Sequence, residues 1–452
     1  MHYFNSPHIA EHLMTEAGWQ SLFASAKQGE TAQFKASVTQ LIAALDESIS
    51  QQISIVIQHP SFKRLESGWR GLASLTSLNV SQRRIKVRIL DASWQDVSGD
   101  LNSSFDLKQS LLYDRLYARE FDTAGGCPFG LLVVDHRVSS EIADDNDFDD
   151  LYTLQLLAEL GDMALCPVAL GVDDGFFGDD PSRLLHDCRK TERILASNDF
   201  RSWQLLRDNV SSRFLHLVLP EYLQRPAYRH YRTDFVLNEP AAKASALWGN
   251  SVYLLARNVI SEFDRISWFG FLRSYNEDGD FGAIVQMSSP VITKVDLHAE
   301  DDGFWSEQGF VPVTSLYLSH QHCFFSNQSV WKVPPGVSRQ LGMLQTNLMA
   351  CRFGHFIKAQ IRDQVGRYDS VAHCQATLES WLKSYVSNVD YSEDAVMAQY
   401  PLRDCEVSIE ASQHDQTRFE CRVMIQPQYQ YDMVDAQVVL STALSGQELG
   451  VA

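Results

Sequence analysis

The fold is decided by the stretch Phe129-Gly130-Leu131-Leu132-Val133-Val134, an apolar run typical of a β-strand that is buried on both faces. A second run of this kind is Ala164-Leu165-Cys166-Pro167-Val168-Ala169-Leu170. Between the two runs, apolar residues recur at helical spacing at Leu151, Leu154, Leu157 and Ala158. A strand, a helix and a strand in this order predict a mainly parallel sheet with helices on both faces.

The same rhythm starts further upstream. Ile85-Lys86-Val87-Arg88-Ile89 alternates apolar and charged residues, which predicts a strand with one solvent-facing side. A helical stripe follows it at Leu107, Leu111, Leu112 and Leu116. The section as a whole therefore predicts a β-α-β-α-β arrangement.

Helical segments flank this section. Residues 8–57 place apolar side chains at spacings of three and four, which predicts two helices with a break near Gln28-Gly29-Glu30. Further along, one helix is expected from Leu341 to Val365, ending before Gly366 as a left-handed cap requires. Another is expected around His373 to Val386.

The chain closes with three segments, within residues 405–409, 419–425 and 434–440, that carry apolar residues at every second position. They predict an antiparallel meander, and the edges of such a sheet can pair with another chain. The candidate inter-subunit strands are marked by Val407, Ile409, Val423, Ile425, Val438 and Leu440.

These patterns place the chain in the α/β class, with a mixed, mainly parallel sheet flanked by helices. We expect an N-terminal helical arm over residues 1–57 and an α/β body over residues 58–340, built as two subdomains. Residues 341–452 are expected to form C-terminal helices and the strand meander.

Composition excludes several classes of function. With 45% hydrophobic and 21% charged residues, the chain has the composition of a soluble globular protein. Its formal net charge of −19 argues against nucleic acid as a partner, because phosphate-backbone binders need clustered Lys and Arg. Residues 1–7 lack a signal peptide pattern and no later stretch is long and apolar enough to insert in a membrane, so we expect a cytoplasmic location.

The eight cysteines are scattered and never take the C-x-x-C spacing of a zinc or redox site. Because most have apolar neighbours, we expect them to be reduced core residues.

Two stretches offer metal-ligand types, and for both a structural interpretation is favoured. Asp145-Asn146-Asp147-Phe148-Asp149 begins like a calcium loop, but Asp150 stands at the glycine position and Leu156 at the glutamate position, so a solvated acidic loop is expected. His320-Gln321-His322-Cys323 would place two imidazoles on one face of a strand, yet no third ligand is identifiable nearby. No metal site is therefore assigned.

No residue pattern predicts catalysis or a bound cofactor. Gly125-Gly126-Cys127-Pro128-Phe129-Gly130 precedes a strand, whereas a phosphate-binding glycine loop must follow a strand and open a helix, so we expect a tight turn. Searches for activated serine and cysteine nucleophiles find nothing in the required context. Carboxylates paired only by the fold leave a cytoplasmic α/β enzyme as the least favoured alternative.

The most specific signal is the stretch His59-Pro60-Ser61-Phe62-Lys63-Arg64-Leu65-Glu66-Ser67-Gly68-Trp69-Arg70-Gly71-Leu72. It resembles the "HPxFxxLExxWRGL" signature of the large subunits of the type VI secretion contractile sheath, the TssC/VipB/ImpC family. Further blocks follow in the family's order, within residues 121–132, 200–220, 309–312, 327–330 and 352–358. The signature residues carried over are His59, Pro60, Trp69, Arg70, Gly71, Trp248, Gly249, Asn250, Pro401, Leu402, Arg403 and Asp404.

The resemblance implies a contractile-tail-sheath fold and a structural role without catalysis. It implies a protomer that pairs with the small sheath subunit, TssB/VipA, and stacks with copies of itself into a helical tube around Hcp rings, on a baseplate. Neighbouring protomers of the family exchange β-strands, which agrees with the meander predicted above. Trp69 has a plain interpretation as a core anchor and Arg70 as a salt-bridge or helix-packing residue.

The family's sheath is taken apart by an AAA+ unfoldase, ClpV, that grips an N-terminal helix. The candidate for that helix here is the amphipathic segment with Leu13, Trp19, Leu22 and Phe23. Family members usually carry a longer and more charged N-terminal arm, which weighs against both the linker strand and the unfoldase contact. A divergent paralogue that caps or regulates the sheath is therefore kept as the second hypothesis.

Overall fold

The structure is a computed structural model of the 452-residue chain. It describes residues 20, 23–24, 31–140, 148–178, 185–231, 236–239, 245–274, 282–317, 319–363, 371–387, 394–411, 418–427 and 438–445. The chain divides into two compact units: Met1–Arg70 with Leu223–Gly249, and Gly71–Tyr222 with Asn250–Ala452.

The described part of the first unit contains two long helices and two small strand pairs. Its helices are α3 (Thr31–Ile57) and α4 (Pro60–Thr76), which runs on into the second unit. Its strands are β4 (Tyr222–Arg225), β5 (Arg229–Tyr231), β6 (Val236–Asn238) and β7 (Leu247–Gly249). β5 and β6 form an antiparallel hairpin, and the Ser50 hydroxyl of α3 donates a 2.9 Å hydrogen bond to the Val236 carbonyl.

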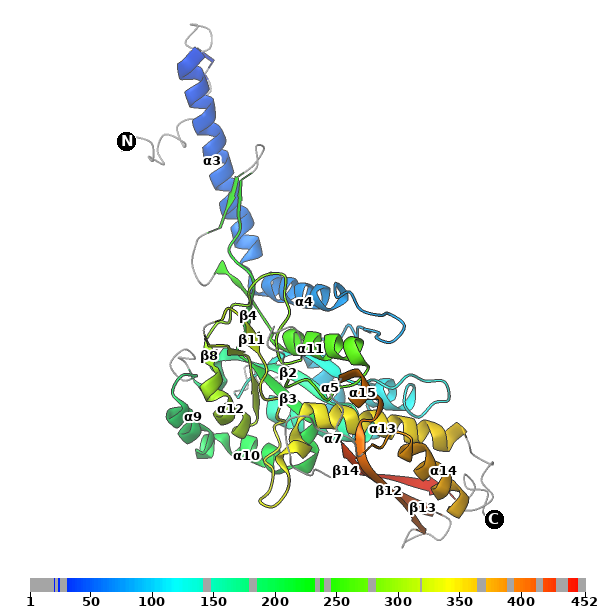
Figure 1. The fold of residues 1–452 in the computed structure, drawn as a ribbon. Helices are drawn as coiled ribbons and strands as arrows, with labels where there is room; N and C mark the ends of the chain where they lie inside the picture. The colour runs from blue at the N-terminus through cyan, green and yellow to red at the C-terminus, as the bar shows by residue number, and fades with distance from the viewer. Residues whose placement is uncertain are drawn as a thin grey trace. The chain divides into compact units, whose positions relative to one another are not determined.

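The second unit is built around a parallel sheet of four strands in the order β1-β2-β3-β9. Figure 1 labels its two central strands, β2 and β3. The strands are β1 (Leu132–Val138), β2 (Val168–Val172), β3 (Leu215–Leu219) and β9 (Phe310–Pro312). The helices of this part are α5 (Trp94–Ser103), α6 (Leu111–Tyr113), α7 (Asp150–Ala164), α9 (Cys188–Leu195), α10 (Arg201–Asp208), α11 (Val252–Ile266) and α12 (Asp302–Glu307). The prediction of an α/β fold with a mainly parallel sheet is confirmed.

Alternate residues of the central strands enter two different cores, as the period of a strand requires. Leu170 and Leu217 pack into one core with Leu154 of α7. Ala169 and Val218 pack into the other with residues of α11 and α13 (Leu344–Asp363). Both faces of the sheet are therefore covered, as predicted.

The second unit also contains a small three-stranded sheet and several short helical turns. A three-stranded sheet joins β8 (Leu297–His298), β10 (Thr314–Ser315) and β11 (His322–Cys323). One short helix, η2 (Asp114–Ala118), is a single-turn π-helix. The short 3-10 helices are η1 (Leu107–Gln109), η3 (Asp174–Phe177), η4 (Asn198–Phe200), η5 (Val210–Phe214), η7 (Ala299–Asp301) and η8 (Arg339–Gly342).

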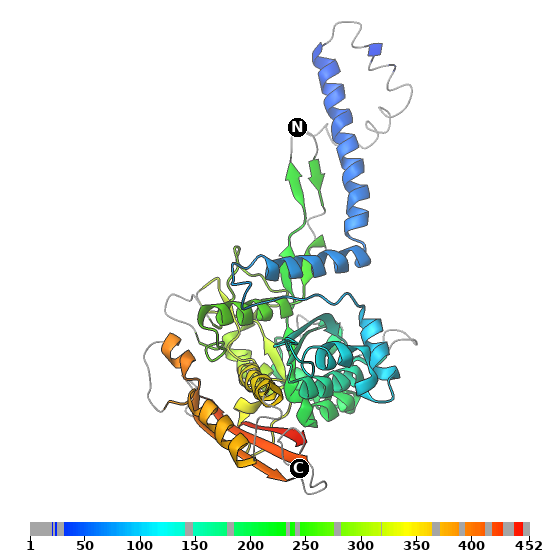
Figure 2. The same cartoon turned by 90° about the vertical axis from the view of Figure 1, so that its right-hand side faces the viewer.

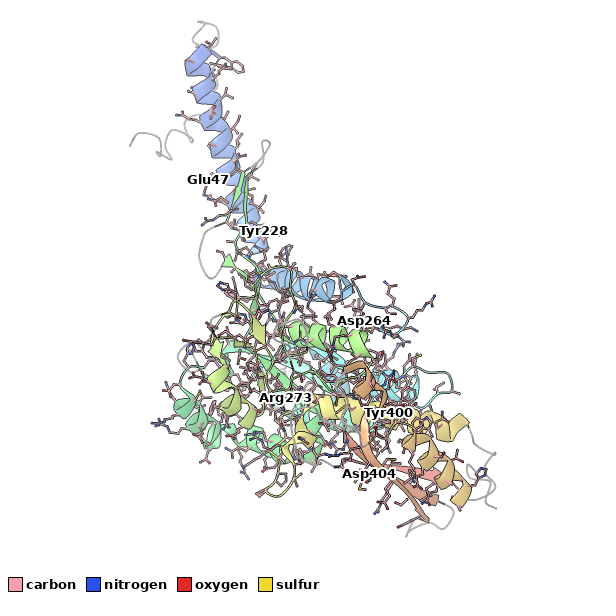
Figure 3. The ribbon with its side chains drawn as sticks, viewed as in Figure 1. Glu47, Tyr228, Asp264, Arg273, Tyr400 and Asp404 are labelled. Carbon is pink, nitrogen blue, oxygen red and sulfur yellow. The ribbon has the colours of Figure 1, made fainter. Side chains whose placement is uncertain are left out.

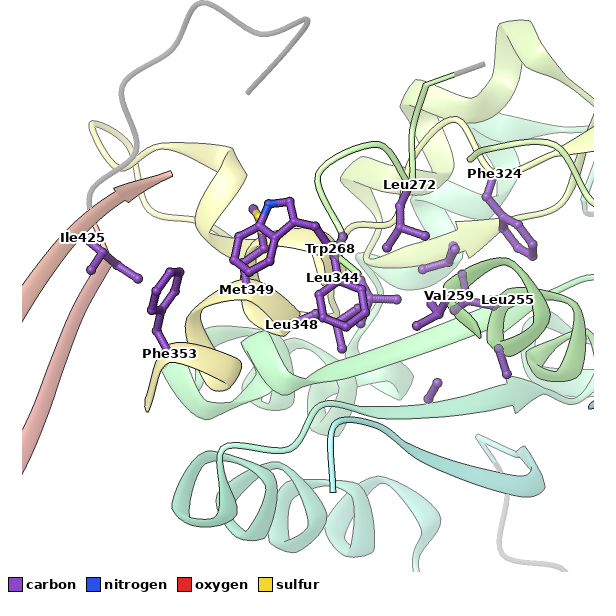
Figure 4. Close-up of a cluster of buried hydrophobic side chains, with 14 of the residues drawn as sticks. Leu255, Val259, Trp268, Leu272, Phe324, Leu344, Leu348, Met349, Phe353 and Ile425 are labelled. Atoms are coloured by element: carbon purple, nitrogen blue, oxygen red, sulfur yellow. The ribbon is translucent and has the colours of Figure 1, made fainter. Parts of the chain in front are cut away.

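The C-terminal part carries α13, α14 (Val371–Lys383), α15 (Asp394–Gln399) and the antiparallel sheet β12-β13-β14 (Figure 2). Its strands are β12 (Leu402–Ala411), β13 (Arg418–Pro427) and β14 (Val438–Ser445). One face of the sheet packs on α13, and Figure 4 draws Ile425 beside Phe353. The predicted meander and the helices before it are confirmed, while the predicted cap at Gly366 lies outside the described residues.

Several predictions about individual elements are wrong. Residues 85–93 belong to no helix or strand, so the predicted strand at Ile85–Ile89 does not form in this chain. β1 begins at Leu132 instead of Phe129 and is only partly buried, because it is an edge strand. The stripe that starts at Leu107 is divided among η1, α6 and η2, and Leu111 is 72% exposed.

The helix at 31–57 is confirmed, but the expected break and the helix before it fall almost wholly outside the described residues. All eight cysteines are free thiols; Cys127 is exposed and Cys188 half-buried, and the other six are buried as expected. Burial raises the pKa of the Cys166 thiol to about 12.

Candidate assembly surfaces

Ion pairs occupy the carboxyl edge of the parallel sheet, where open α/β sheets usually hold their ligands. Arg137, at the end of β1, pairs with Glu221, which follows β3. The Lys294 ammonium lies 2.8 Å from a Glu221 oxygen and also pairs with Asp174, which follows β2. Burial raises the pKa of Asp174, and the hydrogen bond from Lys294 acts in the opposite direction. These charged side chains therefore form ion pairs with one another.

The predicted acidic loop has a structural use at its end. Residues 141–147 lie outside the described part, but Asp149 caps α7 by accepting a 2.9 Å hydrogen bond from the Leu151 amide. Asp150 lies 2.8 Å from Nε2 of His136 and accepts a 2.6 Å hydrogen bond from the Trp94 indole. These two carboxylates hold α7 in place.

The other candidate sites are also occupied by ordinary structure. His322 lies in the two-residue strand β11, and its Nε2 is 4.0 Å from an Asp296 oxygen. Within the described residues, no group of three His, Cys, Asp or Glu side chains could hold a metal ion. Gly125 has a φ of +80°, which agrees with the predicted tight turn.

The signature at residues 59–72 contributes to a partly buried ionic network in the first unit. Glu66 accepts hydrogen bonds of 2.8 Å from Nε of both Arg70 and Arg225. Arg225, with only 4% of its side chain exposed, donates a further 2.8 Å bond to Glu239. Arg70 also donates a 2.9 Å bond to the hydroxyl of Tyr228, which Figure 3 labels. The interpretation of Arg70 as a salt-bridge residue is confirmed.

The network sets the charge of its members. Burial acts to raise the pKa of Glu66, but hydrogen bonds from Arg225 and Arg70 outweigh it and hold that pKa below its ordinary value. The guanidinium of Arg225 also lies 4.0 Å above the Tyr228 ring, in a cation–π contact. α4 is therefore tied to β4 and to the chain around the β5–β6 hairpin by charge-assisted bonds.

Three other signature residues have packing reasons. A Cβ on Gly71 would lie 2.2 Å from the Tyr253 ring, and one on Gly249 would lie 2.2 Å from the Gln224 side chain. Asn250 accepts a 3.0 Å bond from the Val252 amide and donates a 3.1 Å bond to the His136 carbonyl. Glycine at 71 and 249 thus avoids these close contacts, and Asn250 holds the first turn of α11.

The remaining signature residues lie at element ends or on the surface. His59 and Pro60 open α4, with the His59 ring accepting a 3.3 Å bond from the Ser61 amide. Around the start of β12, Pro401 and Leu402 are buried whereas Arg403 and Asp404 are exposed. Trp248 lies half-buried in β7.

The helices α3 and α4 both carry apolar side chains on their surface. We define the α3 stripe as Ile42, Leu45, Ile49 and Val56, which are 42–58% exposed. We define the α4 stripe as Phe62, Leu65 and Trp69, which are 37%, 58% and 63% exposed. Spacings of three and four place each set along one side of its helix. The prediction that Trp69 anchors a core is wrong for this chain.

The terminal sheet offers two kinds of edge. Val407, Ile409, Val423 and Ile425 point into the core, and β13 lies between its two neighbours. At the outer edge of β12, Gln375 donates a 2.8 Å bond to the Val407 carbonyl, and Leu402 pairs with residues 385–387. The outer edge of β14, with Val438 and Leu440, pairs with no other described strand.

The candidate unfoldase helix is almost entirely outside the described residues, which include Phe23 but not Leu13, Trp19 or Leu22. Phe23 is helical and 60% exposed. Within the described residues, every helix is too short or too polar to cross a bilayer.

Comparisons with known proteins agree with these observations. Residues 39–331 match the family model of the EvpB/VC_A0108 tail sheath N-terminal domain, VipB, and residues 337–444 match that of its gpW/gp25-like domain. The chain is 25% identical over 439 residues to the type VI secretion system sheath protein TssC1 of Pseudomonas aeruginosa, covering 90% of this chain and 86% of that protein.

A solved structure, the sheath tail protein of Desulfitobacterium hafniense, is also similar, at 9% identity and a TM-score of 0.33. That match covers 67% of this chain and 62% of the other.

Proposed function

The chain belongs to the EvpB/VipB family of tail sheath proteins, as a large sheath subunit of the type VI secretion system, and from this premise we propose how it acts. It assembles with the small sheath subunit, TssB/VipA, and with copies of itself into a helical tube around the Hcp tube. Contraction of this tube from its baseplate then drives the inner tube outward. The role is structural and cytoplasmic, and it needs no cofactor.

The observation that carries this proposal is the apolar surface of α3 and α4. A soluble monomer rarely exposes rows of large apolar side chains, because each costs free energy in water. Ile55 of α3 is also 74% exposed, although it lies outside the α3 stripe. Burial of both stripes by a second polypeptide would remove this cost, as an obligate assembly does.

The terminal sheet supports the same proposal. The open edge of β14 presents unpaired main-chain groups, to which a strand of a neighbouring protomer can add. Contacts at such an edge involve Val438 and Leu440 of β14 and, where Gln375 moves aside, Val407 and Ile409 of β12. Val423 and Ile425 would support these edges from the central strand.

Energy for contraction is stored in the extended lattice at assembly, so this role needs no nucleotide site on the chain. ClpV would take the contracted sheath apart through the segment that contains Phe23.

The test is co-expression with the small subunit, followed by negative-stain microscopy. We expect long tubules from the pair and poor solubility of this chain alone. Bound pairs that never elongate would indicate the capping or regulatory paralogue instead. Soluble monomers that ignore the small subunit would refute the proposal.

A further inference from the structure

The segment Arg83–Leu90 has the sequence of a β-strand without the pairing of one. It lies between α4 and α5, outside every strand, in the second unit (Figure 2). Within the described part of the chain, the amides and carbonyls of residues 86–92 form no backbone hydrogen bond. Val87, Ile89 and Leu90 are 42%, 65% and 54% exposed. A segment of alternating β-formers is thus left in water with its main chain unsatisfied by the protein.

The segment is also a basic stretch in an acidic protein. Arg83, Arg84, Lys86 and Arg88 fall within six residues of a chain whose net charge is −19. Arg84 lies 3.2 Å from an oxygen of Asp264, which Figure 3 labels, and Arg88 pairs with Glu120. Arg83 and Lys86 are exposed and pair with no carboxylate among the described residues. In an extended strand Lys86 and Arg88 share one face, and Val87 and Ile89 share the other.

These features match a partner strand that alternates acidic and apolar residues. Among the described residues, the strands of this chain with an open edge do not provide one. β14 has an open edge but no carboxylate between Val438 and Ser445. β1 has an open edge with one acidic residue, Asp135, two residues before Arg137. β12 is acidic at Asp404, Glu406 and Glu410, but Gln375 and residues 385–387 occupy part of its outer edge.

We infer that residues 86–90 are a docking strand for the small sheath subunit, which adds an edge strand with carboxylates facing Lys86 and apolar side chains over Val87 and Ile89. This inference rests on the proposed function and gives the small subunit a specific site. Main-chain bonds supply the pairing, and the basic side chains select an acidic partner.

Proline substitutions test the pairing, because proline removes one amide donor and residues 86–90 use none in the free chain. Only alternate residues of a strand direct their amides to a given neighbour. We therefore expect one of Lys86→Pro and Val87→Pro to weaken binding of the purified small subunit at least tenfold. The other should differ less than twofold from its matched control, Lys86→Ala or Val87→Ala.

A charge reversal tests the partner's chemistry. Lys86→Glu should weaken binding about tenfold at low salt and less at high salt, because screening reduces the attraction. The control is Lys190→Glu, which reverses an exposed cation on α9 and should leave binding within twofold.

Amide hydrogen exchange identifies the occupant. Residues 86–90 should exchange at least a hundredfold more slowly in the isolated heterodimer than in the free chain. Slow exchange of residues 86–90 already in the free chain would mean that the partner strand belongs to the same chain. Slow exchange found only in assembled tubes would mean that it belongs to another copy. Either result would overturn the inference. If the wild-type chain fails to bind the small subunit, the proposed function falls; if it binds and no variant weakens binding, only this inference falls.

Discussion

The parallel sheet and the helices α3 and α4 are both rich in apolar residues, but they place them differently. On α10, Trp203 is fully buried, stacked on Phe310 with ring centroids 5.0 Å apart. On α4, Trp69 is 63% exposed, in a row with Phe62 and Leu65. The difference shows that apolar spacing predicts a buried face without saying which polypeptide buries it. We call the core around the parallel sheet the closed region, because the chain itself buries its apolar side chains, and the surface of α3 and α4 the open region. The same substitution at each tryptophan should distinguish the two regions.

The largest effect is expected in the closed region. Trp203→Ala removes an indole from an aromatic cluster that includes Phe176, Trp305 and Phe310. Truncation of a buried tryptophan leaves a cavity and costs about 3–5 kcal/mol of unfolding free energy. Urea unfolding of the full chain, followed by near-ultraviolet circular dichroism, measures this cost. A loss below about 1 kcal/mol would contradict the closed core, and Trp203→Phe should cost less than Trp203→Ala.

A second effect, destabilisation between pH 7.5 and pH 5, is expected from the buried His216 of the closed region. Burial lowers the pKa of His216 on β3 from 6.5 to about 3, and the nearby backbone of Asn327 and Gln328 acts in the opposite direction. Between pH 6.5 and about pH 3, His216 binds a proton in the unfolded chain but not in the folded chain. The free energy of unfolding therefore decreases as the pH falls below 6.5. At pH 5 the loss is about 2 kcal/mol.

The measurement is the free energy of unfolding at pH 7.5 and at pH 5. His216→Leu should remove about 2 kcal/mol of the difference between these two values. An unchanged difference would mean that His216 is protonated or hydrated in the folded chain. His355, with a pKa lowered to about 4 by burial, should contribute in the same direction in both proteins.

The same contrast explains which predictions from the sequence succeed. The strand at Val168, the helix with Leu154 and the terminal meander are confirmed, because their apolar residues are satisfied by nearby parts of the same chain. The patterns at Ile85–Ile89 and Trp69 are equally clear, yet Val87, Ile89 and Trp69 stay exposed. Apolar periodicity predicts a helix face or a strand. It does not predict whether the same chain or another subunit covers that face or pairs with that strand.

Long-range electrostatics was beyond the sequence for a different reason. Arg70 could be assigned to an ion pair, since Glu66 lies one helical turn away. Arg225 and Glu239 complete the network from more than 150 residues along the chain, and only the fold of the first unit brings them together. The ion pairs of Glu221 with Arg137 and Lys294 are of the same kind.

The smallest effect on stability is expected at Trp69, and it is the sharpest test of the contrast. Because its side chain is mostly in water, Trp69→Ala should change the unfolding free energy of the free chain by less than about 0.5 kcal/mol. In the assembly the same side chain would be an interface anchor, whose loss costs about 2 kcal/mol or more of binding free energy. Tubule yield in co-expression should therefore fall while the free chain unfolds normally. Arg70→Ala is the matched control, because it breaks the bonds to Glu66 and Tyr228 and should destabilise the chain itself. A Trp69→Ala chain that unfolds more easily yet assembles normally would reverse the assignment and make α4 part of a closed core.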